Sequence, residues 1–167
     1  SMVGHWHGGL ALSGVLACAL FAAVSGSSPA TVVAIGSILI PGMIKEGFPM
    51  RFGAGVITTS GALGILIPPS IVMVMYAIAT NTSVGALFMA GVIPGIVMAS
   101  MLGGMTWYRA RKFNYPRQPK ASWRQRLSAF RESAWGLMLI IVVMGGIYSG
   151  MFTPTEAAAM SAVYAFV

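Results

Sequence analysis

Two clusters of small and polar residues interrupt the apolar stretches of this sequence, and they are its best candidates for chemistry. The first is SGSSPAT at 25–31, and the second is TTSGALGILIPPS at 58–70. Each cluster has the pattern expected where one helix ends, a glycine follows and a second helix begins. We predict Gly26 as a C-terminal cap, and Ser28 as an N-cap with Pro29 at the first helical position.

A break of this kind presents partial charges of both signs. Carbonyls at a helix C-terminus suit a small hard cation, and amides at a helix N-terminus suit a carboxylate. Hydroxyl groups at both breaks add neutral oxygens, and no Asp or Glu lies in an apolar stretch before Glu156. The expected ion site is therefore built of neutral oxygens, which favours Na⁺ over a proton relay. In the second cluster, we predict that the helix restarts at Pro68 and Pro69.

The composition places the chain among membrane proteins. It has 167 residues, of which 57% are hydrophobic and 8% are charged, against about 25% charged residues in a typical soluble domain. Ten basic and three acidic side chains cannot cover the surface of a soluble domain of this size. We predict an all-α, polytopic membrane protein and exclude an ordinary soluble enzyme or nucleic-acid-binding protein.

The net charge of +7 comes from one segment, because the charges outside 109–132 cancel. A basic segment between apolar stretches is predicted to lie on the cytoplasmic side of the membrane. We expect it to contact anionic lipid headgroups, and nucleic-acid binding is the weaker interpretation. Besides Glu132, the segment holds Arg109, Arg111, Lys112, Arg117, Lys120, Arg124, Arg126 and Arg131.

The later apolar stretches are long enough to cross a membrane. A crossing needs roughly 20 residues to span about 30 Å of hydrocarbon. Residues 84–108 and 133–151 meet this length, and 52–80 is predicted to be a discontinuous transmembrane helix broken at its prolines. Residues 154–167 are the start of the next transmembrane helix, and 1–9 are an interfacial lead-in.

The first apolar block predicts a re-entrant helical hairpin over 10–45. Its two arms, 10–24 and 32–44, have about 15 residues each, or roughly 22 Å at the helical rise. Neither arm crosses comfortably, so we expect the chain to enter and leave on one side with its tip near the membrane centre. Charge does not test this prediction, because two full crossings would return the chain to the same side.

Four stretches together resemble the large membrane subunit of TRAP transporters, the tripartite ATP-independent periplasmic transporters. They contain GSSPAT, LGILIPPS and FTPTEAAA, occur in the expected order and cover nearly the whole chain. The resemblance implies a Na⁺-coupled secondary transporter of the bacterial inner membrane that imports organic anions such as C4-dicarboxylates or sugar acids. It implies a periplasmic substrate-binding protein and a small membrane subunit as partners. The stretches are 19–43, 55–80, 87–97 and 146–165.

By this resemblance, the chain is half of an inverted-repeat transporter that works as an elevator, and the remainder of the large subunit supplies the other half. The chain is much shorter than a full large subunit, so we expect a fragment that does not transport alone. No cofactor is expected besides Na⁺ as coupling ion. Carried onto this sequence, the predicted Na⁺ site is Ser25, Gly26, Ser27, Ser28, Gly61 and Gly64. The predicted substrate-binding residues are Ser28, Thr31, Pro68, Pro69 and Ser70.

Other functions stay open at this point, since such clusters also mark plain loops. One is a non-transporting membrane scaffold or assembly protein, in which the breaks are packing kinks. The other is a different Na⁺/divalent-anion symporter that needs no binding protein. An enzyme is not expected, because the chain has no Asp and its two His, at positions 5 and 7, are close to the N-terminus.

Three further patterns predict structure. The TPTE sequence at 153–156 fits a capping box at a helix start. Residues 122–133 predict an interfacial amphipathic helix. Small residues recur every four positions on 84–108, which favours close helix packing. These small residues are Gly91, Gly95, Ala99 and Gly103.

Overall fold

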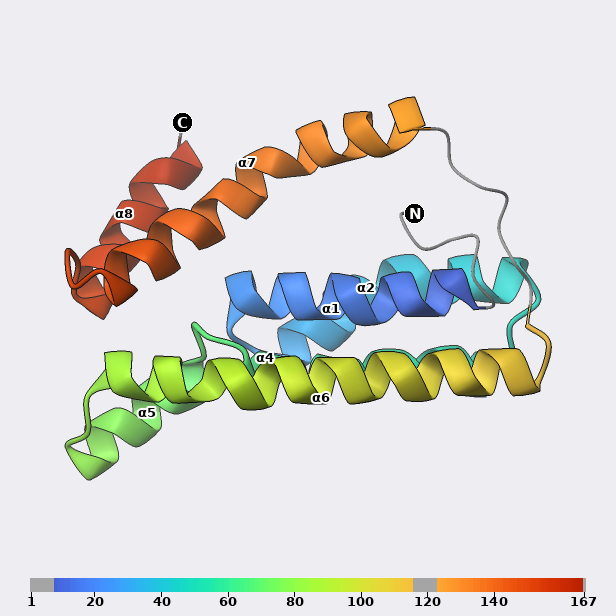
Figure 1. The fold of residues 1–167 in the computed structure, drawn as a ribbon, viewed down its shortest axis with the longest axis horizontal. Coiled ribbons are helices and arrows are strands. Elements are labelled where there is room, and N and C mark those ends of the chain that lie inside the picture. The colour runs from blue at the N-terminus through green and yellow to red at the C-terminus, as the bar shows by residue number, and fades with distance from the viewer. Residues whose placement is uncertain (1–7, 116–122, 167) are drawn as a thin grey trace.

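The protein is described here from a computed structural model, which covers residues 8–115 and 123–166. Those residues form eight helices (Figure 1). The first six helices pack into one block, and the last two form a pair beside it. The helices are α1 (Gly9–Ser25), α2 (Ser28–Lys45), α3 (Met50–Gly61), α4 (Leu63–Leu66), α5 (Ile71–Thr80), α6 (Val84–Lys112), α7 (Trp123–Tyr148) and α8 (Pro154–Phe166).

Helices α1 and α2 pack against each other and are joined by only two residues. Gly26 ends α1 in the left-handed conformation (φ 60°), and its N–H donates to the carbonyl of Ala22, so the predicted glycine cap is confirmed. The prediction for the next helix is wrong by one residue. Ser27, not Ser28, is the extended N-cap residue, because either serine can cap a helix and Pro29 also fits the second helical position.

The two arms are longer than the sequence indicated. α1 has 17 residues and α2 has 18, or roughly 26 and 27 Å at the helical rise. By length and composition α2 could cross a membrane, because it begins at Ser28 and continues through Pro41 to Lys45. Short arms are therefore no longer an argument for re-entry, and the re-entrant path stays a prediction.

The second break is the segment between α4 and α5. The prediction that the helix restarts at Pro68 and Pro69 is wrong, since α5 begins at Ile71 with Ser70 as its extended N-cap. Ile67 is also extended (ψ 121°), because the ring of a following proline disfavours helical backbone. The helical path over 52–80 is thus interrupted between Leu66 and Ile71, and its role as one discontinuous transmembrane crossing stays a prediction.

Helix α6 is the long element against which the breaks pack. It extends beyond the predicted 84–108 to Lys112. A Cβ built on Gly91 would lie 2.8 Å from the carbonyl oxygen of Leu66, and one on Gly95 would lie 3.1 Å from Ile67. Close packing at these two positions is confirmed, whereas a Cβ on Gly103 would meet open space.

Helix α7 joins two segments that the sequence analysis had separated. The predicted amphipathic helix over 122–133 and the predicted crossing over 133–151 form one continuous helix from Trp123 to Tyr148. The capping box at the start of α8 is confirmed: the N–H of Thr153 donates to Glu156 at 2.7 Å, and the N–H of Glu156 donates to the Thr153 hydroxyl at 3.3 Å. Most of the interfacial lead-in and residues 116–122 lie outside the described residues.

The outer faces of the helices are apolar. Val33, Ile93 and Met101 are each at least 70% exposed, which suits hydrocarbon and would be unfavourable in water. In the described residues, three helical paths are long and apolar enough to cross a membrane: 28–45, 50–80 and 84–112. The fold is an all-α, polytopic membrane protein, as predicted.

Candidate functional site

The two helix breaks lie against each other. The N–H of Ile71, the first residue of α5, donates to the carbonyl of Gly26 at 3.2 Å. A Cβ on Gly26 would lie only 2.7 Å from the carbonyl oxygen of Pro69. The end of α1 and the start of α5 therefore meet at a contact that only glycine permits at position 26.

The α1–α2 turn also contacts the region around α4. A Cβ built on Gly64 would lie 2.9 Å from the backbone N of Ser28 and 3.0 Å from the carbonyl oxygen of Ser27. A Cβ on Gly61 would overlap Val32 and lie 3.5 Å from the carbonyl oxygen of Ser28. The structure thus brings together the residues predicted for Na⁺ at both breaks, while their binding of Na⁺ stays a prediction.

Hydroxyl groups inside the α1–α2 turn bond to one another and to the backbone. The Thr31 hydroxyl is fully buried and donates to the carbonyl of Ser27 at 2.8 Å. It also lies 3.1 Å from the hydroxyl of Ser25. Since the single proton of Thr31 is used inside the turn, this residue holds the turn together and has no proton left for a substrate.

Three buried serine hydroxyls in this region have no hydrogen-bond partner in the described structure: those of Ser28, Ser60 and Ser70. Ser60 and Ser70 are at most 1% exposed. A buried hydroxyl without a partner costs about 1–3 kcal/mol, so a fold normally avoids it. Three such oxygens, in or next to the segments that meet, are therefore available to a small polar ligand.

Ser60 belongs to the site more clearly than its neighbours in the sequence. Thr58 and Thr59 are exposed, and the Thr59 hydroxyl donates to the carbonyl of Gly55 at 2.8 Å. Ser60 lies at helical spacing from Gly53, Val56 and Ile57, which are also buried. This spacing is the sequence pattern that indicates the burial of Ser60. The sequence analysis included this serine only among the hydroxyl groups of the second cluster, 58–70.

We expect Thr31→Val to destabilise the protein while keeping the size of the side chain. It removes the hydroxyl that bonds Ser27 and Ser25 at the turn, which costs about 1 kcal/mol. Thermal unfolding in detergent should show a midpoint lower by a few degrees. Thr80→Val also removes a hydroxyl with two partners, the carbonyl of Tyr76 and the hydroxyl of Thr82, but both bonds are exposed, so the midpoint should stay unchanged. Equal midpoints for the two variants would contradict this role of Thr31.

A cavity of about 330 Å³ opens beside the joined breaks. On one side it is lined by Ser25, Gly26, Pro69 and Ser70, and on the other by α7 and α8, including Ser161. The predicted substrate-binding residues do not all line this cavity. Pro69 and Ser70 line it, whereas Pro68 lines a different cavity. Ser161 was missed by sequence reasoning, and no local pattern marks it.

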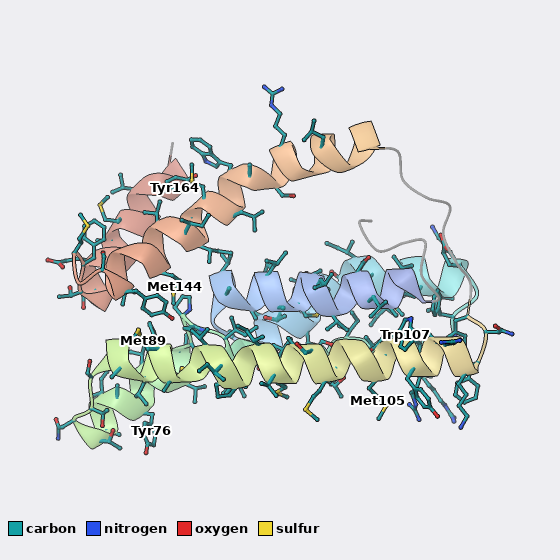
Figure 2. The ribbon with its side chains drawn as sticks, in the orientation of Figure 1. Tyr76, Met89, Met105, Trp107, Met144 and Tyr164 are labelled. Atoms are coloured by element: carbon teal, nitrogen blue, oxygen red, sulfur yellow. The ribbon has the colours of Figure 1, made fainter. Side chains whose placement is uncertain are left out.

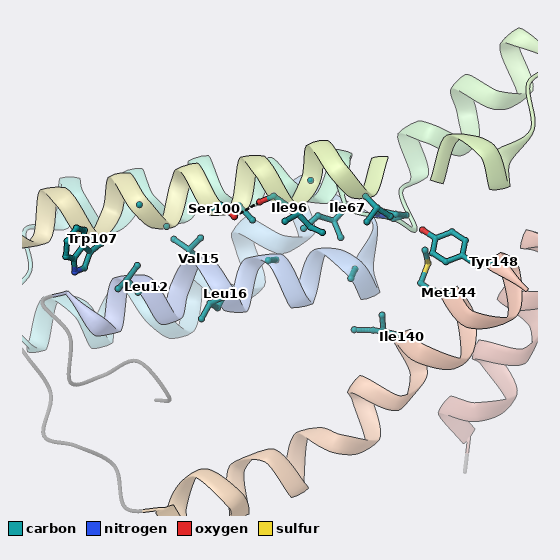
Figure 3. A pocket seen from close by; sticks show the side chains of 18 residues that line it. Leu12, Val15, Leu16, Ile67, Ile96, Ser100, Trp107, Ile140, Met144 and Tyr148 are labelled. Carbon is teal, nitrogen blue, oxygen red and sulfur yellow. Dashed lines mark hydrogen bonds between the residues drawn. The ribbon is translucent and has the colours of Figure 1, made fainter. Parts of the chain in front are cut away.

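The cavity that Pro68 lines is larger, at about 690 Å³, but it is almost wholly apolar (Figure 3). It lies among α1, α6 and α7, with Leu16, Ile96 and Ile140 on its walls. The Ser100 hydroxyl at its edge is already bonded to the carbonyl of Ile96. Walls that are almost wholly apolar do not suit an ion or a carboxylate, so the smaller cavity, with Ser25, Gly26 and Ser70 on its wall, is the better candidate.

Acidic and metal-ligating side chains do not gather in the described part of the chain. No group of three or more His, Cys, Asp or Glu residues comes together in residues 8–115 and 123–166. The partial charges of helix ends, backbone carbonyls and serine hydroxyls are what the joined breaks offer to a ligand. His5 and His7 lie outside the described residues.

Comparison with known proteins agrees with this arrangement. The family described as "Tripartite ATP-independent periplasmic transporter, DctM component" matches residues 1–167. The chain is 71% identical to the C4-dicarboxylate TRAP transporter large permease protein DctM of Rhodobacter capsulatus, covering 99% of this chain and 41% of that protein. It is 57% identical to the protein of the same name from Vibrio cholerae, covering 99% of this chain and 37% of the relative.

A relative that is named for a different substrate is also similar to this chain. The ectoine/5-hydroxyectoine TRAP transporter large permease protein UehC of Ruegeria pomeroyi is 43% identical, over 99% of this chain and 39% of that protein. The chain thus spans about two fifths of the length of these relatives. The family match over every residue decides the assignment: this chain belongs to the DctM component family of the tripartite ATP-independent periplasmic transporters.

Proposed function

We propose that this chain is the part of a large permease subunit that binds a coupling Na⁺ and one side of an organic anion. The observation that carries the proposal is the meeting of two helix breaks, with three buried serine hydroxyls without partners in or next to the segments that meet. Carbonyl and hydroxyl oxygens would bind Na⁺. The first-turn amides of α5 beyond Ile71, whose own N–H is bonded to Gly26, would face the substrate carboxylate. In this proposal the chain takes part in transport and catalyses no chemical reaction.

The substrate class that we propose is a C4-dicarboxylate. It is supported by the name of the relative from Rhodobacter capsulatus, which is 71% identical to this chain. The relative named for ectoine is 43% identical, so large subunits of similar sequence serve different substrates. A cavity of about 330 Å³ is large enough for a small dicarboxylate. Its other wall comes from α7 and α8 and, in our proposal, from the remainder of the large subunit.

We propose an elevator movement between the α1–α6 block and the α7–α8 pair. The two parts touch mainly where α7 meets α6, and the Tyr148 hydroxyl there donates to the carbonyl of Phe88 at a long 3.4 Å. Figure 1 shows α7 diverging from the block along most of its length. One weak polar contact permits sliding more readily than an interlocked interface would. The expected setting is the bacterial inner membrane, with a small membrane subunit and a periplasmic binding protein.

Uptake into proteoliposomes tests the proposal. The vesicles hold the complete large subunit with its small subunit, and a carboxylate panel that includes succinate, a sugar acid and ectoine is offered outside. We expect succinate uptake that needs both an inward Na⁺ gradient and the binding protein. Uptake with Na⁺ alone would favour an ordinary symporter. Absence of uptake with folded protein under every condition would favour a scaffold.

A further inference from the structure

A second feature lies at the basic end of the helix block, away from the joined breaks. Two small cavities there, of about 250 and 240 Å³, share the residues Arg51, Phe52 and Arg109 on their walls. Arg51 is in the first turn of α3, and Arg109 is in the last turns of α6. Two arginines from different helices therefore line both cavities.

The first cavity continues from the two arginines as an apolar groove between α3 and α6. Gly55, Val56 and Thr59 form one wall, and Leu102 and Met105 form the other. From Arg51 to Thr59 the groove follows eight residues of helix, or roughly 12 Å. Figure 2 shows Met105 and Trp107 projecting from different sides of α6, so this groove is separate from the large cavity that Trp107 lines.

Aromatic rings line the second cavity. The ring centroids of Phe52 and Tyr115 are 4.7 Å apart, and those of Phe113 and Tyr115 are 5.9 Å apart. Phe113 is 57% exposed. Tyr side chains are enriched where the hydrocarbon of a membrane meets the headgroups, so we expect Tyr115 and the neighbouring basic residues to lie at headgroup depth and the groove to run from there into hydrocarbon.

We propose that Arg51 and Arg109 bind the phosphate of an anionic phospholipid whose acyl chain occupies the groove between α3 and α6. Arginine suits phosphate because its planar donors match the phosphate oxygens. The other nearby charges are mostly positive, since Lys45, Arg111 and Lys112 lie at this end with Glu46. A neutral headgroup would gain less from these charges than an anionic one.

The size of the groove decides which occupant fits. A transmembrane helix with its side chains is about 10 Å wide and would need several times the 250 Å³ available. An extended hydrocarbon chain is thin enough to enter. A free phosphate would occupy only the end of the groove at the arginines, whereas a phospholipid also fills the part between Val56, Leu102 and Met105 with its own chain.

Native mass spectrometry of the delipidated complete large subunit tests this site with phosphatidylglycerol and phosphatidylcholine of the same acyl chains. We expect the first phosphatidylglycerol to bind at least about tenfold more tightly than phosphatidylcholine, because bonds to charged groups are strong. The double variant Arg51→Gln/Arg109→Gln should remove this preference. The control Lys45→Gln/Lys112→Gln removes the same charge at the same end from two exposed residues outside the groove and should change the preference less than threefold.

A second pair of variants tests the acyl chain. A Cβ on Gly55 or on Gly42 would meet nothing within 4 Å, so both positions accept a larger side chain. Gly55→Leu fills the groove and should weaken both lipids, whereas Gly42→Leu on α2 should weaken neither. Equal effects of the arginine and lysine pairs would overturn the proposal. So would an unchanged affinity in folded Gly55→Leu, or displacement of the lipid by inorganic phosphate alone.

Discussion

Replacing Gly26 by alanine is expected to separate the two helix breaks and to lower Na⁺-driven uptake at least about tenfold. Two effects add at this residue. Its φ of 60° costs an alanine about 1–2 kcal/mol, and the new Cβ would lie 2.7 Å from the carbonyl oxygen of Pro69. Either the turn or the Pro69 segment must move, and a shift worth 1.4 kcal/mol is already tenfold in an equilibrium. The measurement is initial succinate uptake into proteoliposomes.

Gly64→Ala should act in the same direction through a different contact. Its Cβ would press on the backbone of Ser27 and Ser28 at 2.9 Å, and backbone yields less readily than a flexible side chain. The matched control is Gly42→Ala, a helical glycine of α2 whose Cβ would meet open space and where alanine favours the helix. If Gly26→Ala and Gly64→Ala transported as well as the control, the meeting of the breaks would have no role in transport.

The residues that were placed well from the sequence are those whose structure has a local cause. Gly26 was predicted correctly because a glycine after an apolar helix is the residue that most easily adopts the left-handed conformation. The box of Thr153 and Glu156 was predicted correctly because its bonds span only three residues. The restart of α5 was misplaced, because Pro68 and Ser70 are both compatible with a helix start and packing on Gly26 decides between them.

Contacts between distant segments could not be read from the chain alone. The meeting of the two breaks was expected only from the family resemblance, since no spacing rule links Gly26 to Ile71. The inward bond of Thr31 and the burial of Ser60 depend on how α2 and α3 pack. Likewise, the joining of 122–133 with the following apolar stretch was missed because a change in polarity was taken as a boundary, although no proline separates the two parts.

The unpartnered serine hydroxyls lead to a prediction with two opposite readouts. Without Na⁺, Ser60→Ala should stabilise the complete large subunit, because it removes a buried hydroxyl that bonds nothing. The gain should be about 1 kcal/mol or more, and the midpoint of thermal unfolding should rise. With Na⁺ present, the wild-type protein gains the free energy of ion binding. A variant that lacks an ion ligand gains less, so the rise caused by Na⁺ should shrink or disappear.

Ser28→Ala and Ser70→Ala should show the same crossed pattern, each to the extent that its oxygen binds the ion. Ser100→Ala is the control, because that hydroxyl is exposed and already donates to the carbonyl of Ile96 at 2.8 Å. The measurement is the unfolding midpoint in matched Na⁺ and choline buffers. Removing a hydroxyl that is merely buried should raise the midpoint equally in both buffers. Removing a hydroxyl that binds Na⁺ should raise the midpoint only in choline. Because the two roles change the Na⁺ response differently, parallel shifts at all three serines would leave the joined breaks without an ion site.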